Sequence, residues 1–192
     1  MTIDMHAHWS PPELMDIYRA RPEPPMIHTN EAGEEVIKTR RGEQSFDGMF
    51  DDLKTRLAEM DAHGVTTGVL SLWGPHQWIE RLPVAESVPA VQVFNNATSA
   101  VCADNPGRFV AYGSLPMTDM DAAVAELDRI MTMPGMIGAI MPANAFMTHA
   151  DAEAFRPLLT AANGHKAALF IHWGPRPGDP WPRTSADSDN FI

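Results

Sequence analysis

The sequence is poor in several residue types, and each scarcity excludes a class of protein. Its single cysteine, Cys102, rules out an intrachain disulfide. Only three of the fourteen basic residues are lysines and the formal net charge is -11, which argues against partners such as nucleic acid or an anionic membrane surface. No apolar run approaches the roughly 20 residues that cross a bilayer, and residues 1–3 show no basic or apolar leader. We therefore expect a cytoplasmic protein whose partner is a small molecule.

What is present is a chain of 192 residues with an ordinary globular composition, 44% hydrophobic and 20% charged. Five short apolar, β-branched runs alternate with longer amphipathic segments, a pattern typical of βα units that build a parallel sheet. The predicted strands are residues 3–8, 65–73, 109–115, 137–141 and 168–172. The four later strands follow one another with room for one crossover helix each.

Helix signals occupy the intervals between these strands. Apolar spacing predicts helices over 49–60, 84–103, 119–131 and 151–162. We expect Asp119 and Asp151 to cap the starts of the last two helices. Gly64 suits the left-handed position after the first helix, and Asn163-Gly164 is expected to close the last one.

The interval after the first strand is longer and holds an insertion, residues 11–46. Two short runs, 26–29 and 35–39, flank the turn-prone segment 30–33, which predicts a β-hairpin over one end of the sheet. A closed (β/α)8 barrel typically needs about 250 residues. We therefore predict an α/β fold that comprises the first part of a TIM barrel, with five strands, an insertion at 11–46 and no strands six to eight.

The first strand carries the strongest chemical signal, the segment Asp4-Met5-His6-Ala7-His8. Alternate residues of a strand share a face, so Asp4, His6 and His8 are expected to point the same way. Active sites of parallel barrels lie at the carboxyl ends of the strands, where both histidines fall. Two imidazoles at this spacing can bind one Zn²⁺ at roughly 2.0–2.1 Å each. An arbitrary His-x-His is more often a pair of surface histidines, but the strand end favours a metal.

A third histidine, His172, ends the apolar run 168–172. Taken alone, it is equally a buried histidine that is hydrogen-bonded to the main chain. Together with His6 and His8 it is a candidate third ligand, because three nitrogens and a water make an open catalytic zinc site.

Other polar and aromatic residues fall near the same end of the predicted barrel. An arginine there could bind a substrate carboxylate through paired hydrogen bonds, and an aromatic wall would suit a planar substrate. The alternatives are arginines that are simply solvated and tryptophans that close the barrel top. The candidate substrate-binding residues are Arg40, Arg41, Trp73, His76 and Arg176.

Four segments together resemble the amidohydrolase superfamily, in particular the branch typified by aminocarboxymuconate-semialdehyde decarboxylase. They follow in the family's order along nearly the whole chain. The segments are 3–8 (IDMHAH), 56–65 (RLAEMDAHGV), 105–109 (NPGRF) with 113–116 (GSLP), and 170–172 (FIH).

The resemblance implies a distorted (β/α)8 barrel with a small hairpin after strand one and a single zinc or manganese ion. It assigns His6, His8 and His172 as metal ligands. The family's strand-eight aspartate and its catalytic histidine after strand six have no counterpart here. Ile140-Met141-Pro142 stands where binuclear relatives carry a carbamylated lysine, which favours one metal. Members of the branch often form homodimers; association with the missing barrel part is the other expected partnership.

The resemblance also implies an enzyme that removes carbon dioxide non-oxidatively from a small carboxylated cyclic or ring-cleavage compound. Two departures leave the substrate open. Trp173 stands where the decarboxylase type usually has a proline, and its substrate-binding arginine aligns only loosely with Arg40 or Arg41. Two alternatives remain, a metal-dependent hydrolase of a lactone, amide or ester, and a non-catalytic fragment or one piece of a split barrel.

Overall fold

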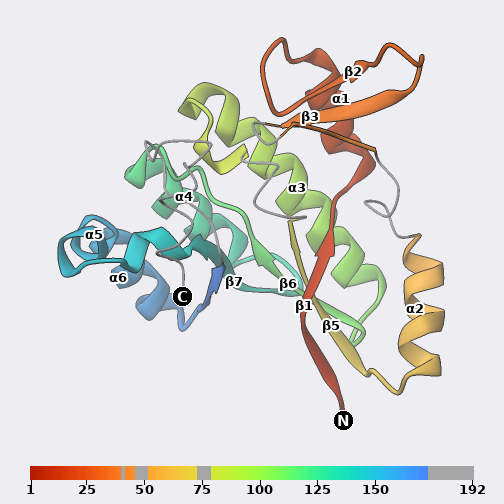
Figure 1. Cartoon of the computed structure of the whole chain (residues 1–192). Coiled ribbons are helices and arrows are strands. Elements are labelled where there is room, and N and C mark those ends of the chain that lie inside the picture. Colours follow the sequence, from red (N-terminus) through yellow and green to blue (C-terminus); the bar gives the residue numbers. More distant parts are fainter. Residues whose placement is uncertain (40–41, 46–51, 73–78, 173–192) are drawn as a thin grey trace.

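The computed structural model describes residues 1–39, 42–45, 52–72 and 79–172. Its main sheet has five strands in the order β1-β5-β6-β7-β8, and each neighbouring pair is parallel. The strands are β1 (Ile3–Trp9), β5 (Thr67–Leu72), β6 (Phe109–Gly113), β7 (Met136–Pro142) and β8 (Ala168–His172). All five predicted strands are confirmed, with ends shifted by at most two residues where both ends are described. The sheet curls as part of a barrel (Figure 1).

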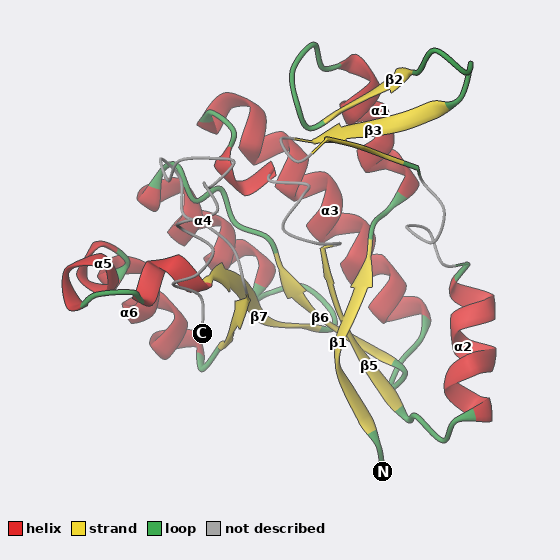
Figure 2. Ribbon diagram, viewed as in Figure 1, coloured by secondary structure: helices red, strands yellow, loops and turns green. Residues whose placement is uncertain are grey.

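Helices cover one face of this sheet (Figure 2). The long helix α3 (Val84–Asp104) continues through Pro89, and α4 (Met120–Ile130) and α6 (Arg156–His165) follow beside it. Helix α2 (Leu53–Ala62) stands beside β1 and β5. Apolar side chains between helices and sheet make the core, among them Phe94, Phe109, Leu127 and Leu158. Within the described residues, no helix has both the length and the apolar character needed to span a membrane.

The helix ends test the predicted caps. Asp119 caps α4, because its carboxylate accepts the Ala122 N–H at 2.9 Å, and Gly64 takes the left-handed φ of +69° after α2. The prediction for Asp151 was wrong. Thr148 caps the short helix α5 (His149–Ala154), and its hydroxyl accepts the Asp151 N–H. Asp151 is thus the third residue of that helix, where an acid is favoured by the exposed N–H groups.

The expected stop at Asn163-Gly164 was also wrong. Both residues lie inside α6, and the left-handed residue is Lys166, with a φ of +56°. A glycine inside a helix costs only about 1 kcal/mol. Burial of Leu158 and Ala162 on the sheet side of α6 outweighs that cost.

The insertion forms a small antiparallel sheet at the end of the molecule towards which β1 runs (Figure 1). Strands β2 (Met26–Thr29) and β3 (Glu35–Thr39) form the predicted hairpin, and the side chain of Asn30 accepts two N–H groups inside its turn. Helix α1 (Pro12–Ala20) and strand β4 (Gly42–Gln44) were not predicted. Residues 49–51 of the predicted helix 49–60 lie outside the described residues.

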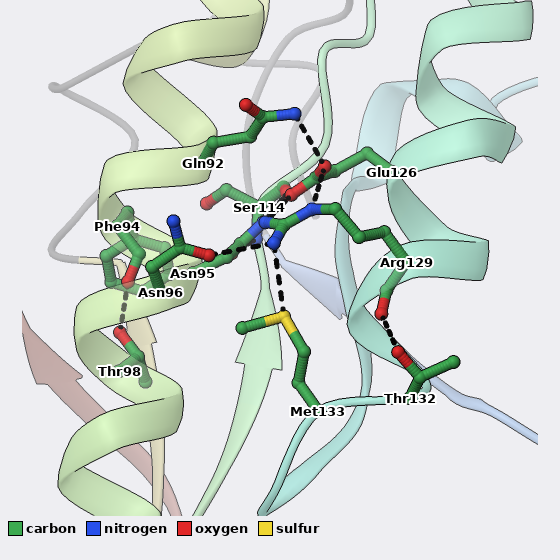
Figure 3. Close-up of polar contacts among 10 residues, drawn as sticks. All are labelled: Gln92, Phe94, Asn95, Asn96, Thr98, Ser114, Glu126, Arg129, Thr132 and Met133. Carbon is green, nitrogen blue, oxygen red and sulfur yellow. Dashed lines mark hydrogen bonds and ion pairs between the residues drawn. The ribbon is translucent and has the colours of Figure 1, made fainter.

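A buried polar network ties the end of β6 to two helices (Figure 3). Asn95 of α3 accepts the Ser114 N–H at 2.9 Å and donates to the Ser114 carbonyl at 2.9 Å. It also donates to the Glu126 carboxylate of α4 at 2.7 Å. Arg129 neutralises that carboxylate through two further bonds of 2.8 and 2.6 Å, although Glu126 is only 4% exposed.

Replacing Asn95 with leucine is expected to lower the free energy of unfolding by about 3 kcal/mol, because a buried N–H, a carbonyl and a carboxylate each lose a partner. Urea denaturation measures this loss. Asn96→Leu is the matched control, since Asn96 is exposed and makes only a surface contact with Arg129. Equal effects of the two substitutions would contradict a stabilising role for the buried network.

Candidate metal centre

Three of the predicted site residues come together where β1 and β8 end. His6 Nε2 lies 2.9 Å from His8 Nε2 and 3.1 Å from His172 Nε2. The ring centroids of these pairs are 4.5 and 4.9 Å apart in edge-to-face arrangements. Although β1 and β8 are the two outermost strands of the described sheet, its curl brings their tips into contact.

The spacing of these nitrogens fits one shared ion. Two nitrogens held at roughly 2.0–2.1 Å from one metal with near-tetrahedral angles lie about 3.4 Å apart. The two observed separations are a few tenths of an ångström shorter, and ligand atoms of all three histidines lie within 4.8 Å of one another. Small side-chain rotations suffice to admit an ion, so the donor set fits a single divalent metal.

Strand β5 fixes the ring of His8. The register pairs His8 with Ser71 and Trp9 with Leu72. His8 Nδ1–H therefore donates to the Leu72 carbonyl at 2.9 Å, and the Ser71 hydroxyl lies 3.3 Å from the same nitrogen. Because Nδ1 carries the proton, Nε2 keeps its lone pair and faces the other two histidines. Metal-binding histidines in proteins are generally held in this way.

The surroundings of His6 and His8 favour the neutral form of their rings, which is the form that binds metal. Burial, with a smaller effect of the neighbouring His6, lowers the pKa of His8 to about 4. Burial and the nearby His172 lower the pKa of His6, and the carboxylate of Asp4 only partly opposes them. Near neutral pH both rings are therefore available as ligands.

An aromatic layer lies beside the three histidines. Phe170, two residues before His172 and on the same face of β8, has its ring centroid 5.1 Å from that of His6 in an edge-to-face contact. The ring of Tyr112 on β6 stacks against Phe170 with centroids 5.1 Å apart. Tyr112 is only 4% exposed, and burial raises the pKa of its phenol. These rings form an apolar wall on the β6 and β8 side of the histidines.

The prediction that Asp4 shares a face with His6 and His8 was wrong. Asp4 pairs with Gly68, but Ala7 pairs with Leu70, so β1 advances three residues where β5 advances two. This β-bulge turns Asp4 to the opposite face, where it lines a shallow cleft beside α2. Its carboxylate accepts the His6 N–H at 3.1 Å.

The five other predicted site residues lie outside the described residues, so their roles stay predictions. Arg40 and Arg41 fall between β3 and β4, Trp73 and His76 follow β5, and Arg176 follows β8.

Two residues near the site were missed by sequence reasoning. Arg56 of α2 donates to the main-chain carbonyl of His8. Glu80, in a short helix after β5 (Ile79–Arg81), accepts a hydrogen bond from the Ser114 hydroxyl at 3.1 Å. Burial raises the pKa of Glu80, and a main-chain hydrogen bond, Arg81, the Ser114 hydroxyl and, least of all, His172 partly oppose that rise. Glu80 could have been found from its place after the carboxyl end of a strand. Arg56 begins the segment 56–65 that resembles the family, but nothing in that segment indicates a bond to the His8 carbonyl.

Curated relatives were found, although no family model matches the chain. It is 30% identical over 146 residues to the gamma-resorcylate decarboxylase of Rhizobium sp. (strain MTP-10005), covering 71% of this chain and 42% of that one. It is 24% identical over 197 residues to the 2-amino-3-carboxymuconate-6-semialdehyde decarboxylase of Dictyostelium discoideum, covering 97% and 51%. The chain thus spans about half the length of these relatives.

The chain also covers about half the length of the solved structures that it matches. The apo form of IDCase from Metarhizium anisopliae matches with a TM-score of 0.74 and 20% identity over 97% of this chain and 54% of that one. The 2,6-dihydroxybenzoate decarboxylase from Rhizobium matches with a TM-score of 0.67 and 24% identity over 99% and 54%. A manganese complex of 5-carboxyvanillate decarboxylase from Novosphingobium aromaticivorans matches with a TM-score of 0.69 and 21% identity over 92% and 51%. These likenesses confirm the predicted partial (β/α)8 barrel.

Proposed function

We infer that the chain belongs with the amidohydrolase-superfamily decarboxylases, of which it spans about half the length. From this premise we propose that the protein removes carbon dioxide non-oxidatively from a small carboxylated ring or ring-cleavage compound. The observation that carries the proposal is the convergence of His6, His8 and His172. The reactions named for the relatives supply the class of substrate, a small organic carboxylate.

We further propose that the three histidines hold one divalent ion. Nitrogen donors suit zinc, and solved decarboxylases with bound manganese make that metal the second candidate. When bound, such an ion acts as a Lewis acid that polarises a coordinated oxygen. The described residues fix its ligands: Leu72 and Ser71 orient the ring of His8, and Phe170 packs against His6.

The proposed substrate-binding group comprises Arg40, Arg41, Trp73, His76 and Arg176. Guanidinium groups at the mouth would pair with the substrate carboxylate, and indole rings would pack against a planar ring. Glu80 adds a carboxyl group at the same end of the barrel. The fourth metal ligand and the remaining barrel strands would come from residues beyond this chain or from a partner, which makes association with the missing barrel part, or a homodimer, part of the proposal.

Hydrolysis of a lactone, amide or ester is the second candidate, because an open three-nitrogen site can also activate water for hydrolysis. The chemistry named for the relatives favours decarboxylation over this alternative.

A substrate panel separates the two reactions. The protein, loaded with Zn²⁺ or Mn²⁺, is incubated with hydroxybenzoates, carboxyvanillate, an aminocarboxymuconate semialdehyde and matched lactones. We expect carbon dioxide release from at least one carboxylate and none from the His172→Ala variant. Ring-opened acid without carbon dioxide would overturn decarboxylation in favour of hydrolysis, and a metal-loaded protein inactive on the whole panel would support the non-catalytic fragment.

A further inference from the structure

Arg56 links helix α2 to the metal-binding end of β1. Its guanidinium Nη2 donates to the main-chain carbonyl of His8 at 2.7 Å, across 48 residues of sequence. The side chain is half-buried, so solvent competes only partly for this bond. Hydrogen bonds from a charged donor are roughly twice as strong as those between neutral groups.

His8 is consequently held at two points. Leu72 accepts a hydrogen bond from its ring, and Arg56 donates one to its main chain. A carbonyl bond alone would leave the ring free to rotate, and a ring bond alone would let the strand end shift. With both in place, Nε2 is directed towards His6 and His172.

The opposite end of α2 provides a natural comparison. There Arg108 donates to the Asp61 carboxylate at 2.7 Å and to the Thr66 carbonyl at 3.1 Å. Arg56 attaches α2 to the sheet through a main-chain carbonyl of β1, whereas Arg108, just before β6, attaches it through an ion pair with Asp61 of α2. Of the two, only Arg56 contacts a residue of the histidine cluster.

We propose that Arg56 is a positioning residue of the metal centre, which it serves by fixing the main chain of His8. This inference rests on the proposed metal centre and is independent of the reaction carried out there. Groups that orient metal ligands from outside the coordination sphere typically contribute about 10-fold to 100-fold to metal affinity. The planar guanidinium holds its bond more rigidly than a lysine ammonium would.

The test measures metal affinity in Arg56→Met, Arg56→Lys and the matched control Arg108→Met. Isothermal titration with Zn²⁺ and Mn²⁺ gives the dissociation constants, and the visible absorption of bound Co²⁺ reports ligand geometry. We expect Arg56→Met to bind each metal about 10-fold to 100-fold more weakly with an altered Co²⁺ spectrum. Arg56→Lys should recover part of the loss, and Arg108→Met should bind like the parent.

Parent-like affinity and Co²⁺ spectrum in Arg56→Met would overturn the inference. So would an equal loss in Arg108→Met, because the effect would then arise from loosening of α2 alone. If Arg56→Met does not fold, the comparison of Arg56→Lys with the parent decides the question in the same way. Metal binding without carbon dioxide release would contradict only the proposed reaction. A parent protein that binds no metal would contradict both the proposed metal centre and the role of Arg56.

Discussion

Replacing His172 with alanine is expected to weaken binding of Zn²⁺ and Mn²⁺ by more than about 100-fold, beyond the usual effect of losing an outer group. The ring supplies the only ligand candidate from β8 among the described residues, and its Nε2 lies 3.1 Å from that of His6. Without it, two ligands on one strand remain. Isothermal titration and metal analysis of the purified variant measure the loss.

The fold of this variant should persist, since His172 lies at the tip of β8 and is only partly buried. His149→Ala is the matched control, because the His149 side chain is 89% exposed and pairs with Glu153 on its own helix. If His172→Ala kept the affinity of the parent, the metal would have to bind elsewhere and the proposed centre would be wrong.

Gly138→Ala is expected to cost at least about 3 kcal/mol of unfolding free energy. Gly138 on β7 has a φ of +156°, and a Cβ there would run into the main chain of Ala168 on β8. Backbone atoms of a paired strand cannot move aside as a side chain can. Because the same β7–β8 pairing positions His172, we also expect weaker metal binding in any variant that folds.

Thermal and urea unfolding measure this effect against Gly164→Ala. Gly164 lies inside α6, and a Cβ added there would meet nothing within 4 Å, so alanine should stabilise the protein by about 0.5–1 kcal/mol. A Gly138→Ala variant as stable as the parent would show that β7 and β8 can separate at little cost.

Those parts of the fold that depend on local patterns could be predicted. The five strands are short apolar runs bounded by turn residues, and the hairpin around Asn30 follows from its turn chemistry. His6, His8 and His172 could be grouped because the parallel order places strand ends together. The strand and turn signals each lie within a few neighbouring residues of the chain, and the grouping of the histidines needs in addition only the rule for parallel strands.

Features that depend on pairing between distant residues could not be predicted. The bulge in β1 arises from its register against β5, and nothing in residues 3–8 marks where the extra residue falls. Arg56 reaches the carbonyl of His8, a group that every residue possesses. The cap at Thr148 competed with an equally good signal at Asp151, and the structure places Thr148 at the cap with Asp151 three residues further along.

The contact between His6 and His172 also affects the conformational entropy of the unfolded chain once a metal ion is bound. The two residues are separated by 166 positions, so an ion bound to both would close a loop that contains most of the described chain. For a covalent cross-link, a loop of that length removes about 5 kcal/mol of conformational entropy from the unfolded state. A bound metal ion closes a loop in the same sense, so it would hold the two outermost strands of the described sheet together.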